Sequence, residues 1–113
     1  MEIHLTPLPK ALFLLFLKYP EGILFKNLVD YKEELMSIYK ELSNREQLHV
    51  IKKSINDVVN STKNSINEKC SRIREAFIKE FDESLAKNYF ITGERSTPKR
   101  IKLDRELVRW EVE

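Results

Sequence analysis

The sequence has little of the chemistry that enzymes and metal proteins commonly use. It contains one cysteine, two histidines and two glycines. A single cysteine excludes a disulfide within the chain and fits a reducing cytoplasm. His4 and His49 lie far apart, with no nucleophile or carboxylate at a telling spacing, and metal-ligand spacing is absent. With only Gly22 and Gly93 there is no glycine-rich phosphate loop, so we expect no enzymatic activity, no cofactor and no metal.

Long apolar runs and a strong charge of one sign are also missing. The run Ala11 to Leu17 is far too short to span a bilayer, and no cleavage site of small residues follows it. We therefore expect a soluble cytoplasmic protein with no membrane contact. The formal net charge of +2 is mild, and the pI of about 8.6 falls short of domains that bind nucleic acid by charge alone.

What is present fits one globular domain. A length of 113 residues with 42% hydrophobic and 34% charged residues favours a single domain over residues 1–113, as a whole protein or as one domain of a longer one. The basic excess is uneven: residues 61–103 hold ten Lys or Arg against six Asp or Glu, and the remainder holds ten against twelve. Such an excess is as typical of a solvated surface as of a phosphate-binding one.

The most informative stretch is the helix predicted from Asn64 to Phe81. At about 100° per residue, one side of this helix carries an apolar stripe that we expect to be buried: Ile66, Cys70, Ile73 and Phe77. Cys70 on this stripe behaves as a small hydrophobe. The opposite side carries a polar face of mixed charge: Asn64, Glu68, Ser71, Arg72, Glu75 and Lys79.

A hairpin is predicted after this helix. Its strands have apolar residues at alternating positions, namely Tyr89, Ile91, Ile101 and Leu103. The turn between them is rich in turn-forming residues, namely Gly93, Ser96, Thr97 and Pro98. Between helix and hairpin, Asp82 to Lys87 extends the helix or forms a loose turn.

The chain before these two elements predicts a short strand and a buried helix. Met1 to Leu5 alternates in polarity and is predicted to be an edge strand. Thr6 is an N-cap with Pro7 at the first helical position, and the helix continues to about Tyr19. Because it is apolar nearly all round from Ala11 to Leu17, we expect it to be the central core helix.

Two more helices are predicted before Asn64. After an extended piece at Ile23 and Leu24, a candidate third strand, a helix runs from about Lys26 to Leu42. Its expected buried stripe is Leu28, Leu35, Ile38 and Leu42, with Tyr31 and Tyr39 at the borders. Ser43 and Glu46 have capping-box spacing and predict a helix from about Arg45 to Val59. Its expected buried stripe is Leu48, Ile51, Ile55 and Val58, and Asn60 to Lys63 form a turn.

At the C-terminal end, Asp104 is predicted to cap a last short helical piece. Leu107, Val108 and Trp110 are expected to fold back on the core, since a buried Trp contributes more than an exposed one. The expected fold class is thus mainly α with a small β-sheet (α+β), specifically a winged helix-turn-helix of about four helices with a C-terminal hairpin as the wing.

Three stretches resemble the winged-helix output domain of two-component response regulators (the OmpR/PhoB type). The first is LTPLPKALFLLFLKYPEGILFKNLVDY, Leu5 to Tyr31. The second is the pattern from Ile66 to Phe77, which includes Arg72-Ile73-Arg74, and the third is YFITGER, Tyr89 to Arg95. The resemblance is divergent: most of that family's N-terminal sheet, the Gly-aromatic pair that closes its wing and the receiver domain are missing, and residues 43–63 are longer.

The resemblance implies sequence-specific binding of double-stranded DNA by a transcriptional regulator or its output domain. The Asn64 to Phe81 helix would lie in the major groove, where Asn67 and Arg72 have the chemistry to read base edges. Lys69 could reach a phosphate, and Ser71 lies on the same exposed side. Arg95, Lys99 and Arg100 at the wing tip could enter a minor groove or hold the backbone.

An alternative remains open. Glu68 and Glu75 lie in the middle of the exposed face, where carboxylates repel phosphates. The same surface, or the segment Ser43 to Lys63, could instead dock a protein partner or a second copy of the chain. Arg74 lies at the border of the apolar stripe, where a structural ion pair is expected, and Asn64 could cap the helix.

Overall fold

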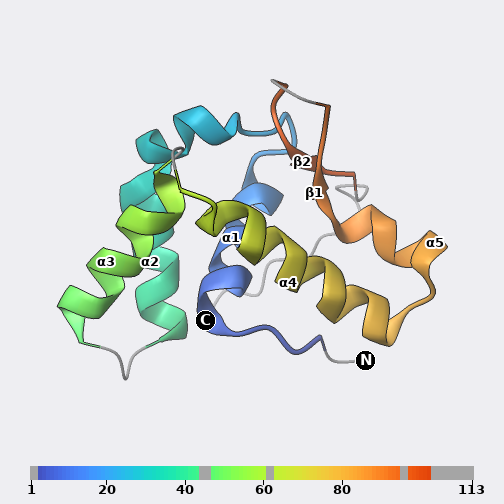
Figure 1. Cartoon of the computed structure of the whole chain (residues 1–113), viewed down its shortest axis with the longest axis horizontal. Helices are drawn as coiled ribbons and strands as arrows, with labels where there is room; N and C mark the ends of the chain where they lie inside the picture. The colour runs from blue at the N-terminus through green and yellow to red at the C-terminus, as the bar shows by residue number, and fades with distance from the viewer. Residues whose placement is uncertain (1–2, 44–46, 61–62, 95–96, 103–113) are drawn as a thin grey trace.

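The computed structural model describes residues 3–43, 47–60, 63–94 and 97–102 of the chain. This part is mainly helical with a small two-stranded antiparallel sheet (Figure 1). The expected α+β class is confirmed. In chain order the elements are α1 Pro7–Lys18, η1 Phe25–Tyr31, α2 Lys32–Leu42, α3 Leu48–Val59, α4 Ser65–Glu80, α5 Glu83–Ala86, η2 Lys87–Tyr89, β1 Ile91–Thr92 and β2 Arg100–Ile101.

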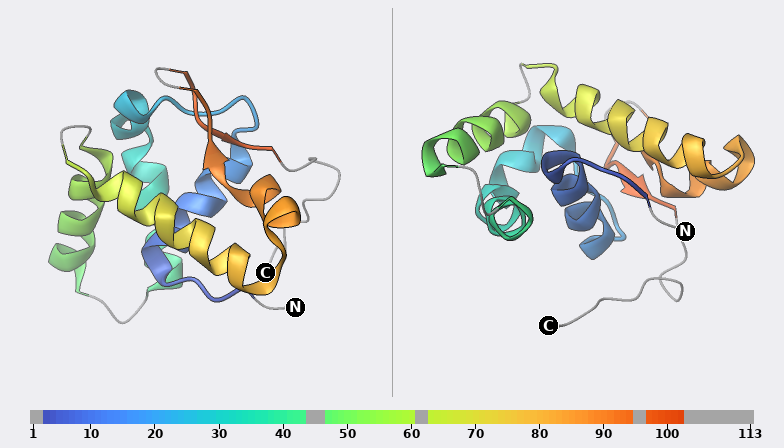
Figure 2. Two further views of the ribbon diagram at one scale, coloured as in Figure 1. Left: turned by 45° about the vertical axis from the view of Figure 1, so that its right-hand side comes forward. Right: turned by 90° about the horizontal axis from the view of Figure 1, so that it is seen from below.

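Helix α1 is the central element, as its apolar sequence predicts. Its fully buried side chains include Leu12, Leu15 and Phe16, and the helix contacts α2, α4 and β2. Figure 2 shows α4 crossing α1, with α2 and α3 to one side and the hairpin to the other. Thr6 is at the N-cap position, although its side chain makes no capping hydrogen bond.

The chain leaves α1 through a turn that only glycine fits well. Gly22 has φ +92°, a conformation that side chains with a Cβ rarely adopt. A Cβ built there would lie 2.8 Å from the carbonyl oxygen of Lys99 and 3.0 Å from the Pro98 Cβ. The turn therefore brings the end of α1 directly against the hairpin.

The helix predicted from Lys26 to Leu42 is split in two. Phe25–Tyr31 forms the 3₁₀-helix η1, and the α-helix begins only at Lys32. The first part contains Asn27, Val29 and Asp30, which are weak α-helix formers, and this composition explains the tighter turn. Leu28 and Leu35 are buried as predicted, whereas Ile38 and Leu42 are half-buried and Met36 and Tyr39 take core positions.

Helix α3 starts later than its sequence predicts. Ser43 is the buried C-cap of α2, and Gln47 is the N-cap of α3, so the predicted capping box does not form. Ile51, Ile55 and Val58 are buried as expected. Leu48 is 49% exposed, against prediction, because it is the first residue of α3 and has no preceding turn of its own helix to pack beside.

Helix α4 confirms the predicted apolar stripe. Ile66, Ile73 and Phe77 are buried and Cys70 is half-buried against the core. The helix ends at Glu80, and a separate short helix, α5, follows in place of an extension or a loose turn. Asp82 caps α5 by accepting a hydrogen bond from the Leu85 N–H at 3.0 Å.

The hairpin has the predicted pairing and gains a third partner. Ile91 pairs with Ile101 and Thr92 with Arg100, and both isoleucines are buried. Ile23 forms an isolated bridge to Lys99, with two backbone hydrogen bonds of 2.9 Å. The candidate third strand at Ile23 and Leu24 does not form; Ile23 makes only this single bridge beside the two-stranded sheet.

Other predictions at the chain ends have different outcomes. Ile3 to Leu5 form no strand: Ile3 and Leu5 pack on the core as extended chain, because this segment runs beside α4 and away from the sheet. Tyr89 belongs to η2 and not to the hairpin strand. Arg95, Leu103, the Asp104 cap and the residues Leu107, Val108 and Trp110 lie outside the described residues.

Candidate nucleic-acid interface

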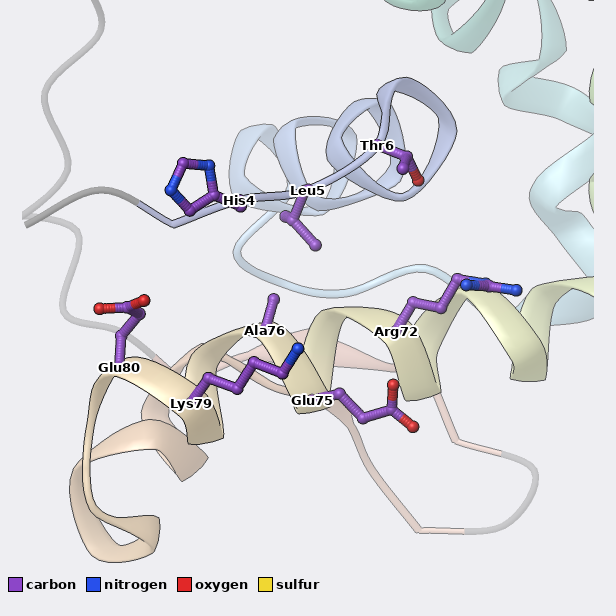
Figure 3. Close-up of a pocket in the computed structure, with 8 residues that line it drawn as sticks. All are labelled: His4, Leu5, Thr6, Arg72, Glu75, Ala76, Lys79 and Glu80. Carbon is purple, nitrogen blue, oxygen red and sulfur yellow. The ribbon is translucent and has the colours of Figure 1, made fainter.

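The outer side of α4 is the surface on which most of the predicted site residues lie. Its buried stripe faces α1, and the polar face, from Asn64 to Lys79, is exposed. One cavity of about 290 Å³ separates α4 from the hairpin. Another, of about 250 Å³, separates α4 from the N-terminal segment (Figure 3). We call them the hairpin groove and the N-terminal groove.

The hairpin groove brings together three predicted site residues from two elements. Asn67 and Ser71 reach it from α4, and Lys99 reaches it from the hairpin. The whole lining is Phe25, Asn67, Cys70, Ser71, Arg74, Ile91, Thr92, Gly93 and Lys99.

Arg72 lies on the other flank of α4, in the N-terminal groove. Figure 3 shows Arg72 and Ala76 on α4 across the groove from Leu5 and Thr6, and Glu75 and Lys79 of the same helix complete the lining on that flank. Lys69 is half-buried on α4 and lines neither groove, and Arg100 is exposed on β2 across from Thr92. The predicted residues therefore form two groups separated by the ridge of α4.

Two of the predicted contacts are already engaged within the protein. The Lys99 Nζ donates a hydrogen bond of 3.1 Å to the Gly93 carbonyl oxygen and another to the Glu94 carbonyl oxygen. The Asn67 Nδ2 donates to the Asn64 Oδ1 at 3.0 Å. Asn64 is the N-cap residue, but its side chain bonds Asn67 and no backbone N–H. Lys99 thus holds the hairpin turn.

Arg72 and Arg100 are unpaired charges within the described part of the chain. The ion pairs there join Lys18 to Glu34 and Lys63 to Asp57, and neither arginine has a carboxylate of a described residue within 4.0 Å. Glu68 and Glu75 are exposed on the same face and form no ion pair with Arg72 in these described ranges. The cations remain available to an external anion.

Arg74 differs from its prediction. Its guanidinium carbon lies 5.3 Å from the centroid of the Phe90 ring, a cation–π contact, and it has no ion pair among the described residues. The reason is that Phe90, just before β1, offers an aromatic face where a carboxylate was expected. The signal that Arg74 joins the hairpin groove was its helical spacing: Asn67, Ser71 and Arg74 share one side of a helix.

Cys70 lines the hairpin groove as a neutral thiol. Burial raises the pKa of Cys70 to about 11, and the nearby Arg74 charge opposes this rise. A thiol with so high a pKa is protonated at neutral pH, so it adds no negative charge to the groove and is a poor nucleophile.

In residues 3–43, 47–60, 63–94 and 97–102, no three His, Cys, Asp or Glu side chains are grouped so that they could hold a metal ion. None of the helices described is long and apolar enough to cross a bilayer. Comparison with protein-family models, curated proteins and solved structures found no match to this chain.

Proposed function

We propose that this chain binds double-stranded DNA in a sequence-specific way, as a transcriptional regulator or the output domain of one. The observation that carries the proposal is the pairing of α4, a 16-residue helix with an exposed polar face, with a basic hairpin directly beside it. A helix of this width fits the major groove, and an adjacent hairpin can meet the backbone. The fold proposed is a winged helix-turn-helix, with α3 and α4 as the helix pair and Thr92 to Arg100 as the wing.

Helix α4 and the hairpin have separate tasks in this proposal. Arg72 and Asn67 reach base edges from opposite flanks of α4, with Ser71 and Lys69 beside them. Arg100 meets a phosphate from the hairpin. The activity is binding and not catalysis, and we place it in the cytoplasm.

A second candidate function is the docking of a protein partner. Leu48 and Val50 at the start of α3 are 49% and 41% exposed, and exposed apolar side chains favour protein contact. This surface lies on the segment between residues 43 and 63 that sets the chain apart from the family it resembles. A docking module would bind duplex DNA weakly at every salt concentration.

A titration against random and selected duplexes at two salt concentrations separates the two functions. Phosphate contacts impose a steep loss of affinity with salt. Arg72→Ala should change the free energy of unfolding by no more than about 0.5 kcal/mol, because the side chain is exposed. Binding to a selected duplex should lose about 1–3 kcal/mol, with relaxed discrimination at one position.

The matched control is Lys40→Ala, which removes one exposed charge from α2, away from α4. It should leave selectivity unchanged. If Arg72→Ala keeps full affinity and full selectivity, the groove-binding proposal fails and the docking function takes its place.

A further inference from the structure

The two grooves beside α4 differ in the charge of their linings. The N-terminal groove contains two cations and two carboxylates, namely Arg72, Lys79, Glu75 and Glu80. Among the described residues, the hairpin groove contains two cations, Arg74 and Lys99, and no carboxylate. Its other polar side chains are hydroxyls and one amide, namely Ser71, Thr92 and Asn67. A groove whose described lining offers cations and hydrogen-bond donors but no carboxylate favours the binding of an anion.

The cations of the hairpin groove are held in place before any ligand arrives. The Phe90 ring supports the Arg74 guanidinium, and a stacked guanidinium keeps its five N–H donors in a planar fork. The Lys99 ammonium uses two of its three donors on the carbonyls of Gly93 and Glu94, which leaves one donor without a partner among the described residues. Less rotational freedom is then lost when an anion binds.

We infer that the hairpin groove is a binding site for a phosphate group, held by the Arg74 guanidinium and the Ser71 hydroxyl with the Lys99 ammonium at its rim. Arginine suits phosphate because its planar guanidinium can donate two parallel hydrogen bonds to phosphate oxygens. The phosphate comes from a DNA backbone or from a free phosphate-bearing molecule. The first source rests on the proposed duplex binding, and the second does not.

The first experiment follows the backbone amides of isotope-labelled protein by NMR during a titration with inorganic phosphate at constant ionic strength. The amide signals of Ser71, Arg74 and Gly93 should shift together and saturate. Arg74→Gln should weaken binding about tenfold, the usual loss for a charged hydrogen bond. Ser71→Ala, at an exposed position that leaves the fold intact, should weaken it severalfold.

The control is Lys79→Gln, which removes the same charge from the same helix on the side of the N-terminal groove. It should change phosphate affinity less than twofold. An equal loss of phosphate affinity in Lys79→Gln and Arg74→Gln would mean that binding depends only on the net charge of the protein, and this result would overturn the inference.

A second experiment identifies the source of the phosphate. Duplexes with a single uncharged methylphosphonate at each backbone position are tested against the unaltered protein and Arg74→Gln. A backbone phosphate in the groove predicts one position where the methylphosphonate weakens the unaltered protein but not Arg74→Gln.

The outcomes separate the two claims. Saturable phosphate binding without duplex binding supports the inference for a free phosphate and contradicts the proposed function. Duplex binding that is indifferent to Arg74→Gln and Ser71→Ala, without saturable phosphate shifts, overturns the inference and leaves the proposed function standing.

Discussion

Phe77 is the residue where α4 meets both α1 and the chain that leads to the hairpin. Its ring centroid lies 5.2 Å from that of Phe13 and 4.6 Å from that of Tyr89, with the Tyr89 ring stacked at 8°. The Phe81 ring stacks against the rings of both Phe77 and Tyr89. Only 4% of Phe77 is exposed, so its buried ring anchors α4 against α1.

Phe77→Ala should therefore lower the free energy of unfolding by about 3–5 kcal/mol, since it removes a buried ring and leaves a cavity between three aromatic neighbours. Urea denaturation measures the change. The control is the next residue: Ile78 is 41% exposed, and Ile78→Ala should stay near 0.5 kcal/mol. Equal midpoints for the two variants would contradict the packing of α4 described above.

At the scale of elements, the hairpin uses its two neighbouring cations differently. Lys99 bonds the carbonyl groups of the turn, whereas Arg100 on β2 is exposed and unpaired among the described residues. The sequence alone treated them as equivalent phosphate contacts. Lys99 therefore stabilises the shape of the hairpin, whereas Arg100 leaves its charge exposed on the hairpin surface.

Arg100→Ala should lower the slope of log affinity against log salt by about one, the loss of a single phosphate contact, for all duplexes alike. Lys99→Ala should also weaken binding, but with altered amide signals across residues 91–101. Lys52→Ala, which removes an exposed charge from α3, serves as the control. If the slope is unchanged by Arg100→Ala, Arg100 does not contact a DNA phosphate.

A second element-scale test concerns the joint between α1 and the hairpin. Gly22→Ala places a Cβ against the Lys99 carbonyl in a backbone conformation that costs a non-glycine residue about 1–2 kcal/mol. Thermal unfolding should show at least this loss, and the amides of Ile23 and Lys99 should exchange faster with solvent. Glu21→Ala, one residue earlier and exposed, should change neither quantity. Unchanged exchange in Gly22→Ala would mean that the bridge does not depend on the glycine.

Sequence periodicity predicted the elements whose signals are local. The apolar stripe of α4, the apolar helix α1 and the turn residues of the hairpin each determine their own structure. The predicted capping box does not form because Ser43 is the buried C-cap of α2, a position that packing determines. Ile3 and Leu5 alternate as a strand does, yet the described residues beside them belong to α4 and offer no strand to pair with.

At the scale of the whole molecule, the sequence could not predict how the candidate site divides. Arg72 and Ser71 are adjacent on α4, but the N-terminal segment covers one flank of that helix and the hairpin covers the other. Which flank each element covers depends on contacts between distant parts of the chain. For the same reason, the partner of Arg74 is Phe90, from the segment just before β1, and not a carboxylate.

Stability should depend on pH at both extremes. The Tyr19 hydroxyl donates to the Glu34 Oε1 at 2.5 Å, and this hydrogen bond raises the pKa of Tyr19 from 10.0 to about 12. A raised pKa means that its contribution is complete below pH 10 and is lost as the pH rises toward 12. Hydrogen bonds from Lys63 to Asp57 and from Ser84 to Asp82 lower the pKa values of these two carboxyls, so their contributions are lost below pH 3.8.

Urea midpoints measured from pH 2 to pH 12 should therefore show a plateau with a fall at each end. Tyr19→Phe removes the ionisable hydroxyl and should flatten the alkaline fall. Glu34→Gln keeps an acceptor without its charge and should reduce that fall by less. An alkaline fall as steep in Tyr19→Phe as in the unaltered protein would contradict the role assigned to the Tyr19–Glu34 contact.

The bridge between Ile23 and Lys99 also has a consequence for the order of folding. It joins two residues that enclose every described helix after α1, so forming it early would require the closure of a very long loop. Helices α2 to α4 lie within that loop and can shorten it by packing with α1 first, which makes hairpin docking a late event. Changes at the bridge should then act on the rate of unfolding and hardly on the rate of folding. Gly22→Ala would shift one arm of the chevron plot, whereas Phe77→Ala, in the earlier helical core, would shift both.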